Sequence, residues 1–71
     1  MHGRERENVV ADLINVYTSA LARAADAAQR SHDLSLPTAE RLAYRHRALE
    51  MQELADQALR MVNELTAQAA A

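Results

Sequence analysis

Three residues with metal-ligating side chains lie about one helical turn apart: His46, Glu50 and Glu53. A dimer could gather two such sets. Carboxylate-bridged di-iron bundles, however, use the order Glu-x-x-His and project those residues into the core. Here the order is His-x-x-x-Glu-x-x-Glu, on the helix face away from the apolar residues. We therefore expect a surface pair between His46 and Glu50 and no metal site.

Groups suited to nucleophilic or acid–base catalysis are sparse. The chain has no cysteine, and Ser19, Ser31 and Ser35 lie outside any nucleophile-elbow motif. The acids and histidines fall mostly on the outward faces of the predicted helices, where nothing excludes water. With one glycine in the chain, no loop is suited to cradling a phosphate. We therefore predict that the protein is not an enzyme and binds no cofactor.

The densest group of charged side chains is the basic stretch around residue 45. Arginines near the start of a predicted helix oppose the positive end of its dipole, and Arg41 and Arg45 repel each other at i,i+4 spacing. Such local conflicts tend to mark functional surfaces. Leu42 and Leu49 lie seven residues apart on the outward side, where the packing row does not bury them. The predicted partner-binding residues are Leu42, Arg45, His46, Leu49, Arg41 and Arg47.

A solvated helix face is the alternative interpretation of this basic stretch. Single exposed leucines are normal on protein surfaces. Three acidic residues are near enough to neutralise the arginines: Asp33, Glu40 and Glu50. Arg41 and Arg45 also flank one side of the predicted packing row, whereas Arg47 flanks the other, so the arginines form no single stripe.

The elements that position these residues are two helices and one break. Pro37 cannot lie in a helix interior because it lacks a donor and clashes with the preceding turn, but it suits a first turn. We predict a helix over about 5–31, a turn over about 32–36 and a second helix over about 37–69. Fraying is expected at Gly3 and at the alanine-rich end. The fold class is therefore all-α, in a single domain over 1–71.

Each predicted helix carries an apolar row with alternating steps of four and three, typical of helices packed side by side. The first row is Val10, Ile14, Tyr17, Leu21, Ala24 and Ala28, and the second is Tyr44, Ala48, Met51, Ala55, Ala58, Val62, Leu65 and Ala69. In an antiparallel hairpin, the residue numbers of two facing positions add to a nearly constant value. A value of 72 aligns the two rows. Half of 72 falls within the predicted turn, which favours an antiparallel helical hairpin.

A second apolar flank lies beside these rows. It consists of Val9, Leu13, Val16, Ala20, Leu54, Leu59 and Met61. A lone hairpin leaves much of this flank in water, and packing against a second copy would bury it. We therefore expect a homodimer that forms a four-helix bundle. The alternative is that the flank receives a different partner.

The function expected from these features is a small protein-interaction module, such as an adaptor, regulator or chaperone-like subunit, with itself and another protein as partners. A component of a secretion system fits the same size and shape. The alternative is an RNA- or DNA-binding regulatory dimer that uses the arginines near the start of the second helix. In architecture the dimer resembles the Rop family of plasmid RNA-binding proteins, and the likeness carries over no residue. The net charge of −2 and the absence of lysine count against nucleic acid.

Composition also suggests a compartment. No apolar run is long enough to span a membrane, and no signal-peptide core follows the start MHGRERE. The absence of cysteine fits a reducing environment. We expect a cytoplasmic protein, and the bias toward arginine and alanine favours a GC-rich bacterial or phage genome.

Overall fold

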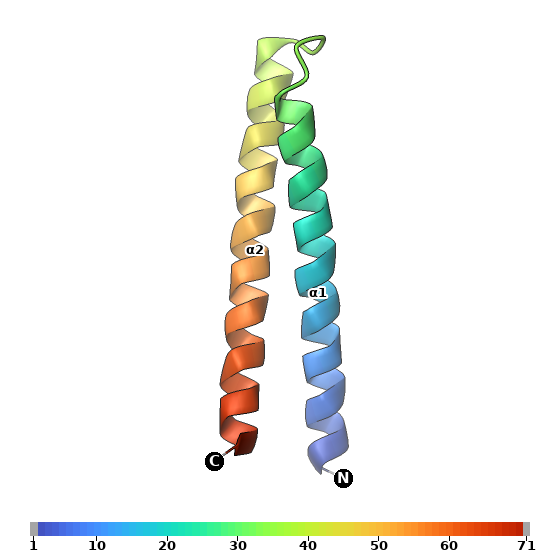
Figure 1. Cartoon of the computed structure of the whole chain (residues 1–71), viewed down its shortest axis with the longest axis vertical. Coiled ribbons are helices and arrows are strands. Elements are labelled where there is room, and N and C mark those ends of the chain that lie inside the picture. The colour runs from blue at the N-terminus through green and yellow to red at the C-terminus, as the bar shows by residue number, and fades with distance from the viewer. Residues whose placement is uncertain (1, 71) are drawn as a thin grey trace.

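The computed structural model describes residues 2–70 as two long helices. Helix α1 covers His2–Ser31 and helix α2 covers Thr38–Ala70, and they run antiparallel so that both ends of the chain lie at the same end of the molecule (Figure 1). The Cα trace measures 53 × 16 × 12 Å. The predicted all-α hairpin is confirmed. Helix α1 begins three residues earlier than predicted and includes Gly3, while Ala71 lies outside the described residues.

The turn between the helices is held by one aspartate. The Asp33 carboxylate oxygen Oδ1 accepts hydrogen bonds from the backbone N–H of Ser35 (2.9 Å) and from its hydroxyl (2.6 Å). These two bonds, with a smaller contribution from the charge of Arg41, hold the pKa of Asp33 below its ordinary value. The Pro37 carbonyl accepts the first helical hydrogen bond of α2, from the N–H of Arg41 at 3.1 Å. Pro37 is therefore the residue that introduces α2, one position before the helix begins.

The contact between the two helices is built from alanine. Every buried apolar side chain among residues 5–69 is an alanine, and none of the larger side chains in that range is fully buried. The buried residues are Ala20, Ala24, Ala27, Ala48, Ala55 and Ala58. Small side chains at these positions let the helices approach closely, and the larger apolar side chains are at most half-buried.

The predicted packing row is confirmed for α2 and wrong in part for α1. Residues of the α2 row from Tyr44 to Leu65 are buried or half-buried, and only its end at Ala69 is exposed. In α1, however, Ile14 is 46% exposed and Leu21 is 40% exposed, while Ala20, which we had placed on the flank, is 2% exposed. The contact face of α1 is rotated toward the alanines. The physical reason is that the small side chains of Ala20, Ala24 and Ala27 let this side of α1 approach α2 closely.

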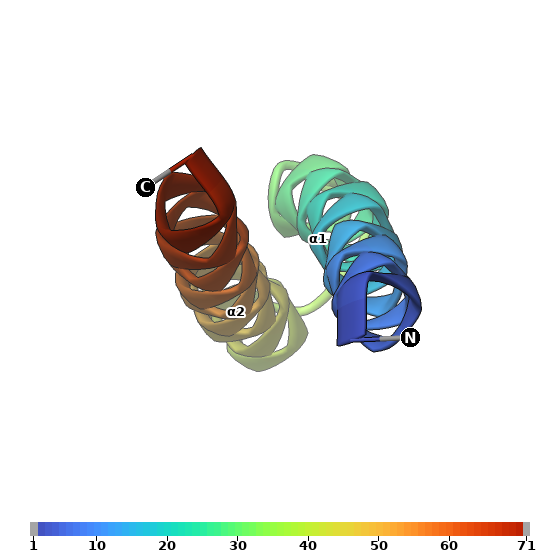
Figure 2. The same ribbon diagram turned by 90° about the horizontal axis from the view of Figure 1, so that it is seen from below.

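The register of the hairpin agrees with the predicted one. The Arg41 side chain meets the Ser31 carbonyl, and the Arg30 side chain meets the Tyr44 hydroxyl. Positions 31 and 41 add to 72, and positions 30 and 44 add to 74. Figure 2, which looks along the helices, shows that no further element of residues 2–70 covers either broad face of the pair. Both faces are therefore open to solvent.

Candidate interaction surfaces

One broad face of the hairpin carries a line of large apolar side chains along its length. Positions a heptad apart fall on one line of a packed helix, which places Ile14, Leu21 and Ala28 together on α1. Ala28 borders the same depression as Arg45 of α2, and Ile14 borders the same groove as Thr66, three heptads after Arg45. These residues therefore lie on one side of the molecule. We call this side the leucine face, defined by Ile14, Leu21, Leu42, Leu49 and Leu59, which are 40–56% exposed.

The opposite broad face carries a shorter apolar patch. Arg23 of α1 and Arg47 of α2 border one depression that shares no residue with the one beside Arg45. The heptad lines through these two arginines contain four exposed apolar side chains. We call this side the valine face, defined by Val9, Val16, Leu54 and Met61. The apolar residues occupy its half near the free helix ends, and the arginines occupy its half near the turn.

The predicted second flank is therefore two surfaces rather than one. Leu59, which we had grouped with Leu54 and Met61, borders a groove with Leu49 and belongs to the leucine face. Leu13 is half-buried and Ala20 is buried, so both belong to the contact between the helices. The sequence pattern grouped these residues because all of them lie next to the packing row, but they flank it on different sides.

The structure brings together four of the six predicted partner-binding residues. Arg41, Leu42, Arg45 and Leu49 border one open depression of about 480 Å³ on the leucine face. Arg47 lies on the valine face. His46 is exposed, and its position two residues after Tyr44 places it on the side of α2 away from α1. A single flat partner could therefore contact the first four residues, but not all six at once.

Arg41 has a structural partner inside the hairpin. Its Nε donates a hydrogen bond to the Ser31 carbonyl at 3.2 Å, and its side chain is half-buried. Ser31 is the last residue of α1, where carbonyl groups lack helical donors and the helix dipole is negative. Arg41 therefore stabilises the end of α1, which offsets its unfavourable position near the start of α2. The sequence could not show this contact, because donor and acceptor lie ten residues apart across the turn.

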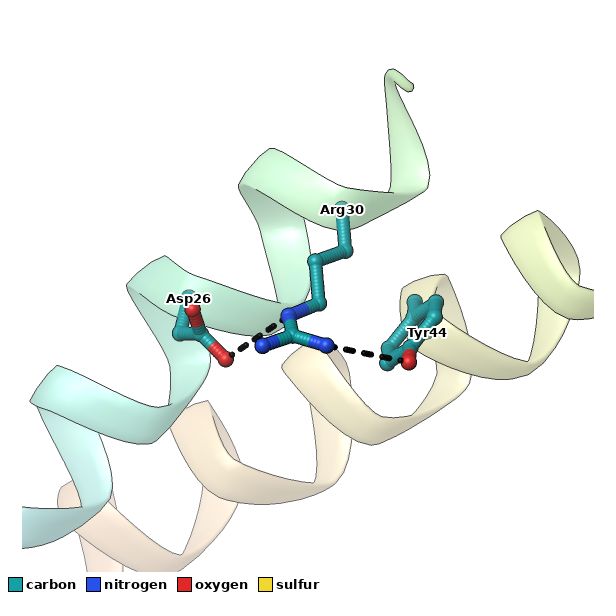
Figure 3. Close-up of polar contacts among 3 residues, drawn as sticks. All are labelled: Asp26, Arg30 and Tyr44. Carbon is teal, nitrogen blue, oxygen red and sulfur yellow. Dashed lines mark hydrogen bonds and ion pairs between the residues drawn. The ribbon is translucent and has the colours of Figure 1, made fainter. Parts of the chain in front are cut away.

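A second cross-helix contact joins Arg30 to Tyr44 (Figure 3). The Arg30 Nη1 donates to the Tyr44 hydroxyl at 3.3 Å, its Nε is 3.2 Å from the Asp26 carboxylate, and its Cζ lies 5.5 Å from the centre of the tyrosine ring. The hydrogen bond to Tyr44, and then the charge of Asp26, raise the pKa of Arg30. All three residues are reachable by solvent, so the contact is weakly stabilising. The i,i+4 spacing of Asp26 and Arg30 was the available sequence signal, and our sequence analysis missed it.

Metal ligation and membrane insertion are two further possibilities for the described part of the chain. No three potential histidine, aspartate or glutamate ligands gather closely enough there to share a metal ion. Between residues 2 and 70, neither helix contains a stretch apolar enough to cross a bilayer.

Comparison with known proteins assigns no family. No protein-family model, curated protein or solved structure matches the chain. Function is therefore inferred from the residues and their arrangement.

Proposed function

We propose that the chain is a non-enzymatic protein-interaction module that acts as a homodimer of helical hairpins. The observation that carries this proposal is the contrast between an alanine contact and two open apolar faces. Nine large apolar side chains on the helices are 40–56% exposed, whereas no side chain larger than alanine is buried among residues 5–69. The apolar area that a globular core would normally bury is therefore available to partners.

The free energy that can be gained by burying these side chains supports this interpretation. Burying a valine, leucine, isoleucine or methionine fully is worth about 1.5–3 kcal/mol, and for side chains that are half exposed roughly half of that remains to be gained. Several such side chains on one face of each copy therefore gain a free energy of the same order as the entropic cost of association, about 4–15 kcal/mol. A hairpin with two such faces can bind a second copy on one and a different protein on the other. This arrangement suits an adaptor or regulator better than a self-contained domain.

The alternative nucleic-acid function, which uses the arginines near the start of α2, receives less support from their positions. Arg41 is engaged with the Ser31 carbonyl, and Arg45 and Arg47 lie on opposite faces. A phosphate backbone needs several cations on one surface to release counterions together. The net charge of −2 adds no general attraction. We therefore treat nucleic acid as an outcome of the test rather than as a second proposal.

Light scattering at micromolar concentration, with circular dichroism on the same sample, tests the proposed function. We expect twice the chain mass of 7.9 kDa together with high helicity. A fully helical monomer would contradict the homodimer. A filter-binding assay with single-stranded RNA and duplex DNA at low salt is the second arm. Binding that weakens steeply with salt, with a smaller slope for the double variant Arg45→Ala and Arg47→Ala, would favour the nucleic-acid function instead.

A further inference from the structure

We propose that the second copy binds along the leucine face in antiparallel orientation, with the turn of each subunit beside the free helix ends of the other. This inference rests on the proposed homodimer and assigns its interface. In this arrangement Leu42, Arg45 and Leu49 contact the second copy. It also leaves the valine face outward, as the surface available to a different protein.

The distribution of apolar residues along each face distinguishes the two surfaces. On the leucine face, large apolar side chains recur from Leu42, beside the turn, to Ile14, toward the free ends, and polar residues such as Arg45 and Gln52 lie among them. An antiparallel copy that overlaps this face along the whole length therefore meets large apolar side chains at several levels. On the valine face, the same overlap would set Val9 and Met61 of one copy against the level of Arg23 and Arg47 of the other. Full overlap therefore matches apolar side chains better on the leucine face than on the valine face.

The spacing on α1 fits a two-fold axis. The midpoint of Ile14 and Leu21 falls between residues 17 and 18, and the midpoint of α1 falls between residues 16 and 17. In a symmetric antiparallel pair, Ile14 of each copy then faces Leu21 of the other, and the two helices overlap almost completely. Self-complementary contacts of this kind, in which residue i meets j and j meets i, define an isologous interface.

The charges on the leucine face complement each other in the same arrangement. Glu7 lies one heptad before Ile14, at the free end, and borders the same groove as Ile14. With Ile14 facing Leu21, Glu7 faces Ala28 of the second copy. Ala28 borders the same depression as Arg45. Each end of the interface therefore brings the Glu7 carboxylate close to the Arg45 guanidinium, with Arg6 bordering the same groove as Glu7, whereas a parallel pair would place the two Arg45 side chains at one level.

Shape supports the same alignment. Leu49 is 56% exposed and lies at the level of residues 23–25 of α1 in the observed register. In the antiparallel pair this level meets residues 10–12 of the second copy. An open apolar groove lies there, bordered by Val10, Ile14 and Leu65. Leu49 of each subunit therefore lies at the level of this apolar groove in the other.

A matched pair of aspartate substitutions tests which face is used. Leu21→Asp lies on the leucine face and Val16→Asp on the valine face, and the two side chains are equally exposed, at 40% and 41%. Sedimentation equilibrium of each variant gives the dimer dissociation constant. We expect Leu21→Asp to weaken the dimer by about 100-fold or more, since two carboxylates become buried per dimer. Val16→Asp should change the constant by less than about threefold. The reverse order would overturn the assignment of the face.

Charge reversal tests the orientation with exposed side chains that the fold does not require. Glu7→Arg and Arg45→Glu should each weaken the dimer by about 3- to 10-fold, and the double variant should recover most of the loss. Helicity measured by circular dichroism should stay unchanged. A double variant as weak as the sum of the two single variants would overturn the antiparallel orientation. A wild-type monomer would instead overturn the proposed homodimer, so the two failures are distinguishable.

Discussion

Arg41 and Arg45 lie one turn apart on α2, yet they meet different surroundings. Arg41 reaches back across the turn to the Ser31 carbonyl and is half-buried. Arg45 is exposed on the leucine face. The two arginines therefore have separate roles, since one stabilises the end of α1 and the other is available to a partner. The sequence pattern does not distinguish them, because both are arginines near the start of a helix.

Replacing Arg41 by alanine should reveal its structural role. Arg41→Ala removes a hydrogen bond to a helix end and should lower the stability by about 1 kcal/mol, or roughly 4–8 °C in the melting temperature of a chain this size. Arg47→Ala is the matched control, since Arg47 lies on the valine face outside the proposed dimer interface, and it should change the stability by less than about 0.5 kcal/mol. Thermal unfolding followed by circular dichroism, at one fixed protein concentration, measures both. Equal effects of the two substitutions would contradict the structural role of Arg41.

At the scale of the helices, alanine spacing fixes how α1 and α2 pack. Ala55 is 0% exposed, which makes it the most enclosed side chain on the contact line. Alanines at 20, 24 and 27 form the matching surface on α1. Close contact of this kind tolerates no enlargement, because the facing backbone occupies the space that a longer side chain would need.

Enlarging one buried alanine should therefore be costly. Ala55→Leu should destabilise the hairpin by about 1–3 kcal/mol through overpacking. Ala67→Leu places the same side chain on an exposed position of the same helix. Leucine and alanine are both good helix formers, so the comparison isolates packing from helix propensity. Denaturant unfolding of the two variants measures the difference, and a stabilised Ala55→Leu would show that the helices are not in close contact there.

Sequence periodicity identifies the two helices, the turn and the packing row of α2, because Pro37 and the four–three alternation are strong local signals. It does not identify the rotation of α1. Helix α1 carries apolar residues on four adjacent heptad lines. The sequence pattern alone therefore accepts Leu21 and Ala20 equally as residues of the contact with α2. The choice depends on the side chains they would meet on α2, which no single-helix pattern contains. The division of the predicted site has the same origin, since Arg45 and Arg47 are separated only by their positions around α2.

At the scale of the whole molecule, the hairpin has an open design. Two helices in a 53 × 16 × 12 Å rod leave every residue close to the surface. A chain of 71 residues is marginal even with a conventional core, and it has no disulfide to add stability. Alanine burial supplies less apolar area than leucine or phenylalanine burial would. The stability of the folded hairpin is therefore expected to depend on association.

This dependence predicts a melting temperature that rises with protein concentration. When a folded dimer unfolds to two chains, each tenfold increase in concentration stabilises the dimer by about 1.4 kcal/mol, because association follows mass action. For a dimer with twice 71 residues, this corresponds to a rise of roughly 3–6 °C for each tenfold step. Melting curves between micromolar and millimolar concentration measure the slope, and Leu21→Asp should reduce it. A wild-type melting temperature independent of concentration would mean that the alanine contact alone holds the hairpin together. The two apolar faces would then serve other proteins only.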